Sequence, residues 1–394
     1  MANSRQRVGM EGSIAIAEAV RLANADVIAA YPITPQTHIV ERLAEMVANG
    51  ELDAEYIPVE SEHSAMSACL GSAAVGARTF TATAGQGLEL MHEVLYVASS
   101  MRLPIVMAVA DRALSAPLSV WGDHSDAMAV RDTGWIQIFA ENAQEAHDLV
   151  LWAFRVGEDP SVLFPVMVHI DGFNLSHVTE PVLIRDQADV NRFLPPNRYP
   201  LPLHPDRPVT MGAFGPPAIY TEAKKAQEVA FENTKPFILK AWEEFEKIFG
   251  PRYSPVETYK AEDAETLLLT MGSLSETASL AVDKMRAEGK RVGLVRIRLW
   301  RPFPFAEIRQ ALSRAKTVIV FDRSISFGGP GGPVFSEIKA ALYGQPAQPR
   351  VVGLIGGLGG RDVTPSDFEY MVNRGNEIAQ KGSPAESEMI GVRE

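Results

Sequence analysis

Residues 79–87, Thr-Phe-Thr-Ala-Thr-Ala-Gly-Gln-Gly, decide the fold of the amino-terminal half. The run over 79–84 favours a β-strand, and the glycines predict a turn that leads into a helix over 88–100. Similar buried strands recur along the chain, separated by helices, which predicts a parallel sheet covered on both faces. The other predicted strands are Val27–Ile33, Glu55–Val59, Pro104–Ala110 and Val162–Asp171, and the other predicted helices are 13–23, 37–48, 63–77 and Asn142–Gly157.

The pattern changes after residue 194. Eight prolines fall within 195–217, a density that excludes a helix or a central strand and predicts an extended tether. A polar helical stretch, Thr221–Phe249, follows, and a second α/β unit begins near Ala264. Its predicted strands are 265–273, 291–300, 317–322 and 350–356, and its predicted helices are 275–288, 305–314 and 333–343. We therefore expect a first domain over 1–194, a connector over 195–261, a second domain over 262–380 and a loose polar tail over 381–394.

Composition limits the classes of function. Acidic residues outnumber basic ones by 49 to 37, a formal net charge of −12 that argues against general binding of nucleic acid or anionic membranes. The single cysteine, Cys69, cannot form an intrachain disulfide or supply the ligands of an iron–sulfur cluster. The first residues lack the apolar core of a signal peptide, and no apolar run approaches the roughly 18–20 residues of a membrane span. We expect a soluble, cytoplasmic chain without a membrane span.

Polar and glycine-rich turns follow four of the predicted strands. Ligands of open parallel sheets gather at the carboxyl ends of the strands, so these turns outline a pocket. The turns are Tyr31–Pro35 (YPITP), Val59–Glu62 (VESE), Thr83–Gly87 (TAGQG) and Ala110–Arg112 (ADR).

Each turn also has an ordinary structural interpretation. Gly85-Gln86-Gly87 could hold a phosphate at a helix start, but neither GxGxxG nor GxxxxGK[ST] is present, so spacing alone favours a plain turn. Glu62 directly follows Ser61, a predicted N-cap, and could simply complement the helix dipole. Arg112 could grip a carboxylate with two N–H groups or form a structural ion pair. Thr34 could make only a turn hydrogen bond.

Other motifs are less informative. Asp123-His-Ser-Asp126 suggests a metal site or a hydrolase triad, but the chain has no HxxxH, HExxH or GxSxG pattern, and we assign no metal ligand. Cys69 lies among small apolar residues and is predicted to be an inert buried thiol. The clusters Gly328–Gly332 and Gly356–Gly360 predict close backbone packing or contact with a partner.

A resemblance emerges when the motifs are taken in order. They are YPITP (31–35), VESEHSA (59–65), TATAGQGLELMHEV (81–94), RLPIVM (102–107), ADRALSAPLS (110–119) and GDHSDAMAVRDTGW (122–135). Together they resemble the alpha subunit of the 2-oxoacid:ferredoxin oxidoreductase family, of the pyruvate:ferredoxin oxidoreductase type, over nearly the whole chain. The resemblance implies an α/β fold in which a pyrimidine-binding thiamine diphosphate domain precedes a transketolase C-terminal-like domain.

The resemblance also implies a divided active site. In this family the cofactor lies between the pyrimidine-binding domain and a diphosphate-binding domain whose GDG…N motif holds Mg²⁺, and this chain has no such motif. Thiamine diphosphate is therefore expected to be shared with a beta subunit that carries the diphosphate and Mg²⁺ contacts. The other expected partners are gamma and iron–sulfur (delta) subunits, coenzyme A, and either ferredoxin or a flavin/NAD module.

Motif matching assigns expected roles to individual residues. Glu62 is expected to hydrogen-bond N1′ of the aminopyrimidine, which promotes removal of the proton from the thiazolium C2 atom. Arg112 is expected to hold the carboxylate of a 2-oxo acid, and Thr34 to help position that substrate. The residues expected to approach the cofactor are Gly85, Gln86 and Gly87, and those expected on the substrate side are Trp121, Asp123 and His124, in the loop Ser119–Asp126.

Pyruvate is the expected substrate, oxidised to its acyl-CoA and CO₂ with electrons passing to iron–sulfur clusters on partner subunits. Phenylglyoxylate is an open alternative, because Trp121 and Leu118 could stack an aromatic ring. We find no second basic residue placed to pair the distal carboxylate of 2-oxoglutarate. A non-catalytic assembly subunit and a nicotinamide dehydrogenase are further alternatives, disfavoured by the intact motifs and by the missing GxGxxG, respectively.

Overall fold

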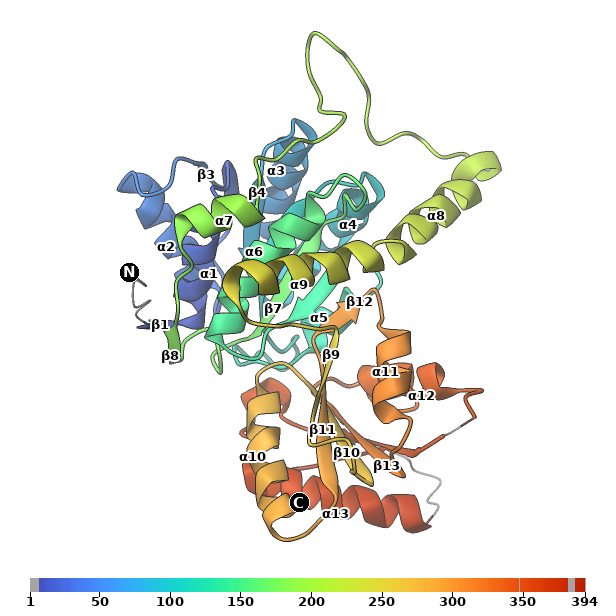
Figure 1. Ribbon diagram of the computed structural model, residues 1–394. Helices are drawn as coiled ribbons and strands as arrows, with labels where there is room; N and C mark the ends of the chain where they lie inside the picture. The colour runs from blue at the N-terminus through green and yellow to red at the C-terminus, as the bar shows by residue number, and fades with distance from the viewer. Residues whose placement is uncertain (1–6, 347, 382–386, 394) are drawn as a thin grey trace.

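The computed structural model describes residues 7–346, 348–381 and 387–393. Two sheet-containing domains lie one below the other, joined by a connector that partly projects from the body of the molecule (Figure 1). The first domain contains β1 (Val8–Glu11), α1 (Gly12–Leu22), β2 (Val27–Ala30), α2 (Thr37–Ala48), β3 (Glu55–Pro58), α3 (Glu62–Ala74), β4 (Thr79–Thr83), α4 (Gly85–Ser100), β5 (Ile105–Asp111), α5 (Ser125–Ala129), β6 (Ile136–Phe139), α6 (Ala143–Gly157), β7 (Val166–Asp171), β8 (Thr179–Val182) and α7 (Gln187–Phe193).

The connector contains α8 (Pro217–Glu232) and α9 (Lys235–Phe249). The elements after it are β9 (Val256–Tyr259), β10 (Thr266–Met271), α10 (Leu274–Ala287), β11 (Val292–Ile297), β12 (Leu299–Arg301), α11 (Phe305–Leu312), β13 (Thr317–Asp322), α12 (Pro333–Leu342), β14 (Arg350–Ile355), the 3₁₀ turn η1 (Leu358–Gly360), α13 (Pro365–Lys381) and β15 (Ser387–Met389).

Both domains are built on mainly parallel sheets. The strand order is β12-β6-β7-β5-β4-β2-β3 in the first sheet and β15-β14-β13-β10-β11-β9 in the second. The edge strands β12 and β9 run antiparallel to their neighbours, and the other pairs of these two sheets are parallel. The predicted fold class, an α/β chain with parallel-sheet domains, is confirmed.

The central strand β5 shows why these sequences form a covered sheet. Side chains alternate between the two faces of a strand. Val106, Ala108 and Ala110 pack in a core with helices α1, α2 and α6, whereas Met107 and Val109 pack in a second core with α3 and α4. Because both faces are buried, the residues of β5 before Asp111 are all apolar, which explains the run without a polar face.

The single strand predicted over 291–300 is wrong, because the structure divides this run at Arg298. The part before Arg298 forms β11 in the second sheet, whereas the part after it forms β12, which pairs with β6 of the first sheet. Arg298 is buried and forms ion pairs with Glu145 on α6 and Glu257 on β9. An apolar run therefore contributes to two sheets, and the short strand β6 was not predicted at all.

Three other predictions need correction. Helix α4 begins at Gly85, so Gly85-Gln86-Gly87 forms its first turn instead of preceding it. The predicted polar helix over 221–249 is two helices, and the second buries Trp242 and Phe245, among others, on one face. The tail is not loose over Ser387–Met389, which pairs with β14, while residues 382–386 and 394 lie outside the described residues.

The first part of the connector, residues 195–233, contains no buried residue. Helix α8 contains no buried residue, and the proline-rich segment before it extends away from the first domain (Figure 1). Among the described residues, no helix is long and apolar enough to cross a bilayer.

Candidate active site at the strand ends

The turn Tyr31–Pro35 is fixed to the central sheet by one buried side chain. The amide Nε2 of Gln36 donates to the carbonyl of Tyr31 at 3.0 Å and to the carbonyl of Ala82, on β4, at 2.9 Å. This pair of hydrogen bonds brings the YPITP turn next to the end of β4, as the rule for parallel sheets predicts.

Glu62 begins helix α3, and its carboxylate is held in an unusual environment. Ser61 caps the helix by accepting a hydrogen bond from the backbone N–H of Ser64 at 3.2 Å, so Glu62 is not needed as a cap. Glu62 is only 6% exposed, yet no residue in the described part of the chain hydrogen-bonds its carboxylate. The carboxylate is therefore largely shielded from solvent but still open to a ligand that supplies a hydrogen-bond donor.

The first turn of α4 faces that carboxylate. A Cβ atom at Gly87 would lie 2.6 Å from Oε1 of Glu62 and 2.6 Å from Oγ1 of Thr83. The Thr83 hydroxyl is buried without a hydrogen-bond partner, as are both amide atoms of Gln86. Because Gly87 has no side chain, the first turn of α4 can lie this close to both the Glu62 carboxylate and the unpaired Thr83 hydroxyl.

Arg112 follows β5 and contacts two of the other turns. Its Nε donates to the carbonyl of Ser119 at 2.8 Å and its Nη1 to the carbonyl of Thr34 at 2.9 Å. The aliphatic part of the side chain crosses Gly85, where a Cβ atom would lie 3.0 Å from Cδ of Arg112. Burial lowers the pKa of Arg112, and the nearby Asp126 opposes this effect.

Asp126 is the residue that sequence reasoning missed. It is fully buried, and its Oδ2 accepts hydrogen bonds from the backbone N–H groups of Gly85, at 2.8 Å, and Arg112, at 2.9 Å. Burial raises the pKa of Asp126 well above the ordinary carboxyl value, Asp111 adds to the effect, and the two N–H groups oppose it. Asp126 thus ties the start of α4 to the end of β5, a function that the motif DHSD alone does not reveal.

The three residues predicted on the substrate side lie at the boundary between the domains. Trp121 is 54% exposed and its ring lies 5.9 Å from that of Phe173. Asp123 accepts hydrogen bonds from within its own loop and from the second domain, and Nε2 of His124 lies 2.9 Å from Oδ1 of Asp171. Burial lowers the pKa of His124, and Asp171 opposes this. Substrate contact by these three residues stays a prediction.

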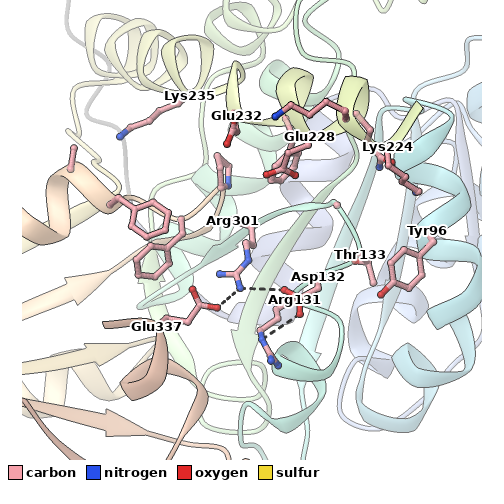
Figure 2. Close-up of a pocket in the computed structure, with 18 of the residues that line it drawn as sticks. Tyr96, Arg131, Asp132, Thr133, Lys224, Glu228, Glu232, Lys235, Arg301 and Glu337 are labelled. Atoms are coloured by element: carbon pink, nitrogen blue, oxygen red, sulfur yellow. Dashed lines mark hydrogen bonds and ion pairs between the residues drawn. The ribbon is translucent and has the colours of Figure 1, made fainter. Parts of the chain in front are cut away.

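A wide groove elsewhere has a different character. It lies between α8, residues 131–134 of the first domain and residues 301–309, and has a volume of about 1060 Å³ (Figure 2). Nη2 of Arg301 forms ion pairs with Oε1 of Glu337, at 2.6 Å, and with Oδ1 of Asp132, at 3.5 Å, so part of the arginine's charge is neutralised within the chain. None of the site residues predicted above lines this groove. The chemistry of the strand ends is therefore separate from it.

The described residues contain no group of three or more His, Cys, Asp and Glu side chains arranged to hold a metal ion. The strand-end site instead offers an unpaired carboxylate beside a glycine-containing helix start, on a parallel sheet. These features are typical of a domain that binds an organic cofactor at the carboxyl edge of its sheet.

Comparisons with known protein families identify the class. Residues 18–241 match the thiamine diphosphate-binding domain of pyruvate flavodoxin/ferredoxin oxidoreductases, and residues 264–368 match core domain II of pyruvate:ferredoxin oxidoreductase. The chain belongs to the pyruvate:ferredoxin oxidoreductase family. It corresponds to the alpha subunit of these multisubunit 2-oxoacid oxidoreductases, which confirms the resemblance drawn from the motifs.

Individual relatives support this assignment. Subunit PorA of pyruvate synthase from Methanothermobacter thermautotrophicus is 51% identical over 360 residues, which cover 91% of this chain and 93% of that protein. Subunit VorA of ketoisovalerate oxidoreductase from Pyrococcus horikoshii is 46% identical over 95% of this chain and 94% of that protein. The 2-oxoglutarate:ferredoxin oxidoreductase of Magnetococcus marinus has a similar fold, with a TM-score of 0.72 and 21% identity, over 95% of this chain and 66% of that chain.

Proposed function

We propose that this chain is the alpha subunit of a complex that oxidatively decarboxylates pyruvate to acetyl-CoA and CO₂. The observation that carries the proposal is the buried Glu62 carboxylate, which has no hydrogen-bond partner in the described residues and faces Gly87. The similarity to pyruvate synthase subunits, up to 51% identity over nine-tenths of the chain, supports pyruvate as the substrate.

The residues at this site suit the aminopyrimidine end of thiamine diphosphate. A heteroaromatic ring between α3 and the start of α4 would supply a hydrogen-bond partner to Glu62. The unpaired Thr83 hydroxyl would be available to hydrogen-bond a polar atom of the same ring. A side chain at Gly87 would intrude on that space. Thiamine diphosphate supplies the nucleophilic carbon and the electron sink that decarboxylation of a 2-oxo acid requires.

The chain's own residues then divide the work. With thiamine diphosphate bound, Glu62 would hold a proton at N1′ of the aminopyrimidine. Arg112 binds the carboxylate of the 2-oxo acid with the edge of its guanidinium that carries no partner among the described residues. Thr34, whose carbonyl accepts a hydrogen bond from Arg112, would help to position the substrate next to that arginine.

Partner subunits complete the proposed site. We assign the diphosphate and Mg²⁺ contacts to a beta subunit, and the iron–sulfur clusters to other chains that pass electrons to ferredoxin or to a flavin/NAD module. One cysteine, Cys69, is too few for a cluster, and burial raises the pKa of its thiol to about 12, which makes it a poor metal ligand. Coenzyme A would accept the acyl group within the complex.

A branched 2-oxo acid is the second candidate substrate. It is favoured by the ketoisovalerate oxidoreductase relative, whose identity of 46% is close to that of the pyruvate synthase subunits. Phenylglyoxylate stays a prediction from the sequence, since Leu118 and Trp121 are both largely exposed on their loop.

Purification of the native complex through a tag on this chain tests the proposal. We expect the highest kcat/KM with pyruvate in a panel that also contains 2-oxoisovalerate, phenylglyoxylate and 2-oxoglutarate, and iron in the co-purified subunits. We also expect weak thiamine diphosphate binding by the isolated chain and tight, Mg²⁺-dependent binding after the beta subunit is added. Tight binding by the isolated chain would contradict the divided site.

Replacing Gly87 by alanine should weaken cofactor binding. The added methyl group would lie 2.6 Å from the Glu62 carboxylate and would displace it, so we expect about a tenfold rise in the Kd of thiamine diphosphate. Titration of the assembled complex with the cofactor measures this change.

Gly71 provides a matched control for that variant. It lies within helix α3, and a Cβ atom added there meets nothing within 4 Å. Gly71→Ala should leave the cofactor Kd unchanged and raise the stability of the chain by about 0.5–1 kcal/mol, because alanine is a better helix former. Equal cofactor affinity in the two variants would count against a ring next to Gly87.

A further inference from the structure

Residues 119–124, which we call the bridging loop, belong to the first domain but are held by the second. The backbone N–H of Gly359 donates to Oδ2 of Asp123 at 3.0 Å. The N–H of Gly360 donates to the carbonyl of Gly122 at 2.8 Å. Both donors lie in the glycine cluster Gly356–Gly360, which follows β14. The cluster therefore holds the bridging loop through its backbone N–H groups.

Arg323, at the end of β13, holds the same loop from a second direction. Its Nη2 donates to the carbonyl of Gly122 at 2.9 Å, and its own carbonyl accepts from the N–H of His124 at 2.9 Å. Its Nη1 pairs with Asp171, which also accepts from the N–H of Ser273 at 2.7 Å. Burial alone would raise the pKa of Asp171, but Arg323 and His124 outweigh this and hold it below its ordinary value.

The other end of the bridging loop contacts the candidate substrate arginine. The carbonyl of Ser119 accepts the hydrogen bond from Nε of Arg112, while Nη1 of Arg112 donates to Thr34. Its remaining nitrogen, Nη2, has no hydrogen-bond partner within the part of the chain that the structure describes. The direction in which Nη2 points therefore depends on the position of the Ser119 carbonyl.

We propose that the second domain sets the orientation of Arg112, and with it the affinity for the substrate carboxylate, through Asp123 and Arg323. In this inference both are positioning residues that act through the bridging loop, and Asp123 takes this role in place of the substrate contact expected from the motif. The inference rests on the proposed role of Arg112 in substrate binding.

Asp123 is well suited to this role, because each of its oxygens has a separate task. Oδ1 accepts from the N–H of Ser125 at 2.9 Å and from its hydroxyl at 2.6 Å, which shapes the end of the loop, whereas Oδ2 faces Gly359 of the second domain. Loss of the carboxylate would remove the hydrogen bond by which the loop's own side chain holds the second domain. The Arg112 side chain would then have to be ordered when the substrate binds, and the entropy lost in this ordering would weaken substrate binding.

The test is a double-mutant cycle in the reconstituted complex. We expect Asp123→Ala to raise the KM for pyruvate about tenfold, with kcat changed by less than about threefold and the KM for coenzyme A unchanged. In the Arg112→Ala background, the same substitution should have no further effect on the KM for pyruvate, because its effect passes through the arginine.

Two further variants sharpen the comparison. Asp123→Asn keeps the shape and the contact with Ser125 but turns an N–H toward the N–H of Gly359, so it should raise the KM less than the alanine variant. If Asp123→Ala fails to assemble, Asp123→Asn alone decides the outcome. Glu276→Ala is the control, because it removes another interdomain hydrogen bond, from Asn142 at 2.9 Å, that does not involve the bridging loop. Its KM for pyruvate should match that of the unaltered complex.

The outcomes separate this inference from the proposed function. If Arg112→Ala raises the KM for pyruvate but Asp123→Ala and Asp123→Asn leave it unchanged, the inference is overturned and the proposed function stands. Additive effects in the double variant would also overturn it. If Arg112→Ala leaves the KM unchanged, the proposed role of Arg112 fails, and this inference fails with it.

Discussion

Glu62→Gln should abolish most of the turnover of the reconstituted complex while leaving its assembly intact. Glutamine has nearly the same shape, and Glu62 makes no hydrogen bond within the described residues that the substitution would break. An amide cannot exchange a proton with the pyrimidine nitrogen as a carboxyl group can. We expect kcat to fall about 10²–10⁴-fold, the range typical of a lost general acid–base group. Steady-state oxidation of pyruvate, with the cofactor saturating, measures the effect.

The neighbouring Glu60 offers a matched control in the same VESE motif. It is exposed and accepts a hydrogen bond from the Ser64 hydroxyl on the outside of α3. Glu60→Gln should therefore keep at least half of the normal kcat. Near-normal turnover in Glu62→Gln, or an equal loss in both variants, would contradict the assignment of Glu62.

Arg112→Ala should raise the KM for the 2-oxo acid by about 30-fold or more, since loss of one partner of a buried charge-assisted pair typically costs about 2–5 kcal/mol. The KM for coenzyme A should stay within twofold, because the acyl acceptor does not need the arginine. The KM of Arg112→Lys for the 2-oxo acid should lie between those of the unaltered complex and Arg112→Ala, since a lysine keeps the charge but cannot contact Ser119, Thr34 and a carboxylate simultaneously. Substrate saturation curves of the assembled complex give both constants.

Arg131 serves as the control for that series. It is a partly exposed arginine at the groove beside α8, and its Nη1 donates to the carbonyl of Met128. Arg131→Ala should leave both KM values unchanged. A similar rise in the KM for pyruvate would show that the effect of Arg112→Ala reflects a general change in charge and not a specific contact.

Local patterns made the sheet of the first domain predictable. Strand β5 is buried on both faces, so its sequence has no polar face before Asp111, and the helices between the strands keep their own spacing. The meeting of Glu62 with Gly87, and of Arg112 with Thr34, also followed from the rule that the carboxyl ends of parallel strands share one edge.

Contacts between distant residues could not be predicted in this way. Asp171 and Arg323 are 152 residues apart, and nothing near either residue specifies the other. Asp126 holds Gly85 and Arg112 through backbone N–H groups, which every residue except proline possesses and which leave no mark in the sequence. The division at Arg298 likewise depends on Glu145 and Glu257, whose carboxylates lie on different elements.

The placement of β12 has a consequence for how the chain is made. During synthesis, residues 1–194 leave the ribosome well before Leu299–Arg301, the strand that pairs with β6. Until then the backbone edge of β6 has no strand to cover it, and such an edge is a template for pairing with other chains. The sheet of the amino-terminal domain is thus completed only by a late part of the polypeptide. A nascent or truncated chain that ends within the connector therefore exposes the unpaired backbone edge of β6, which β12 covers in the finished protein.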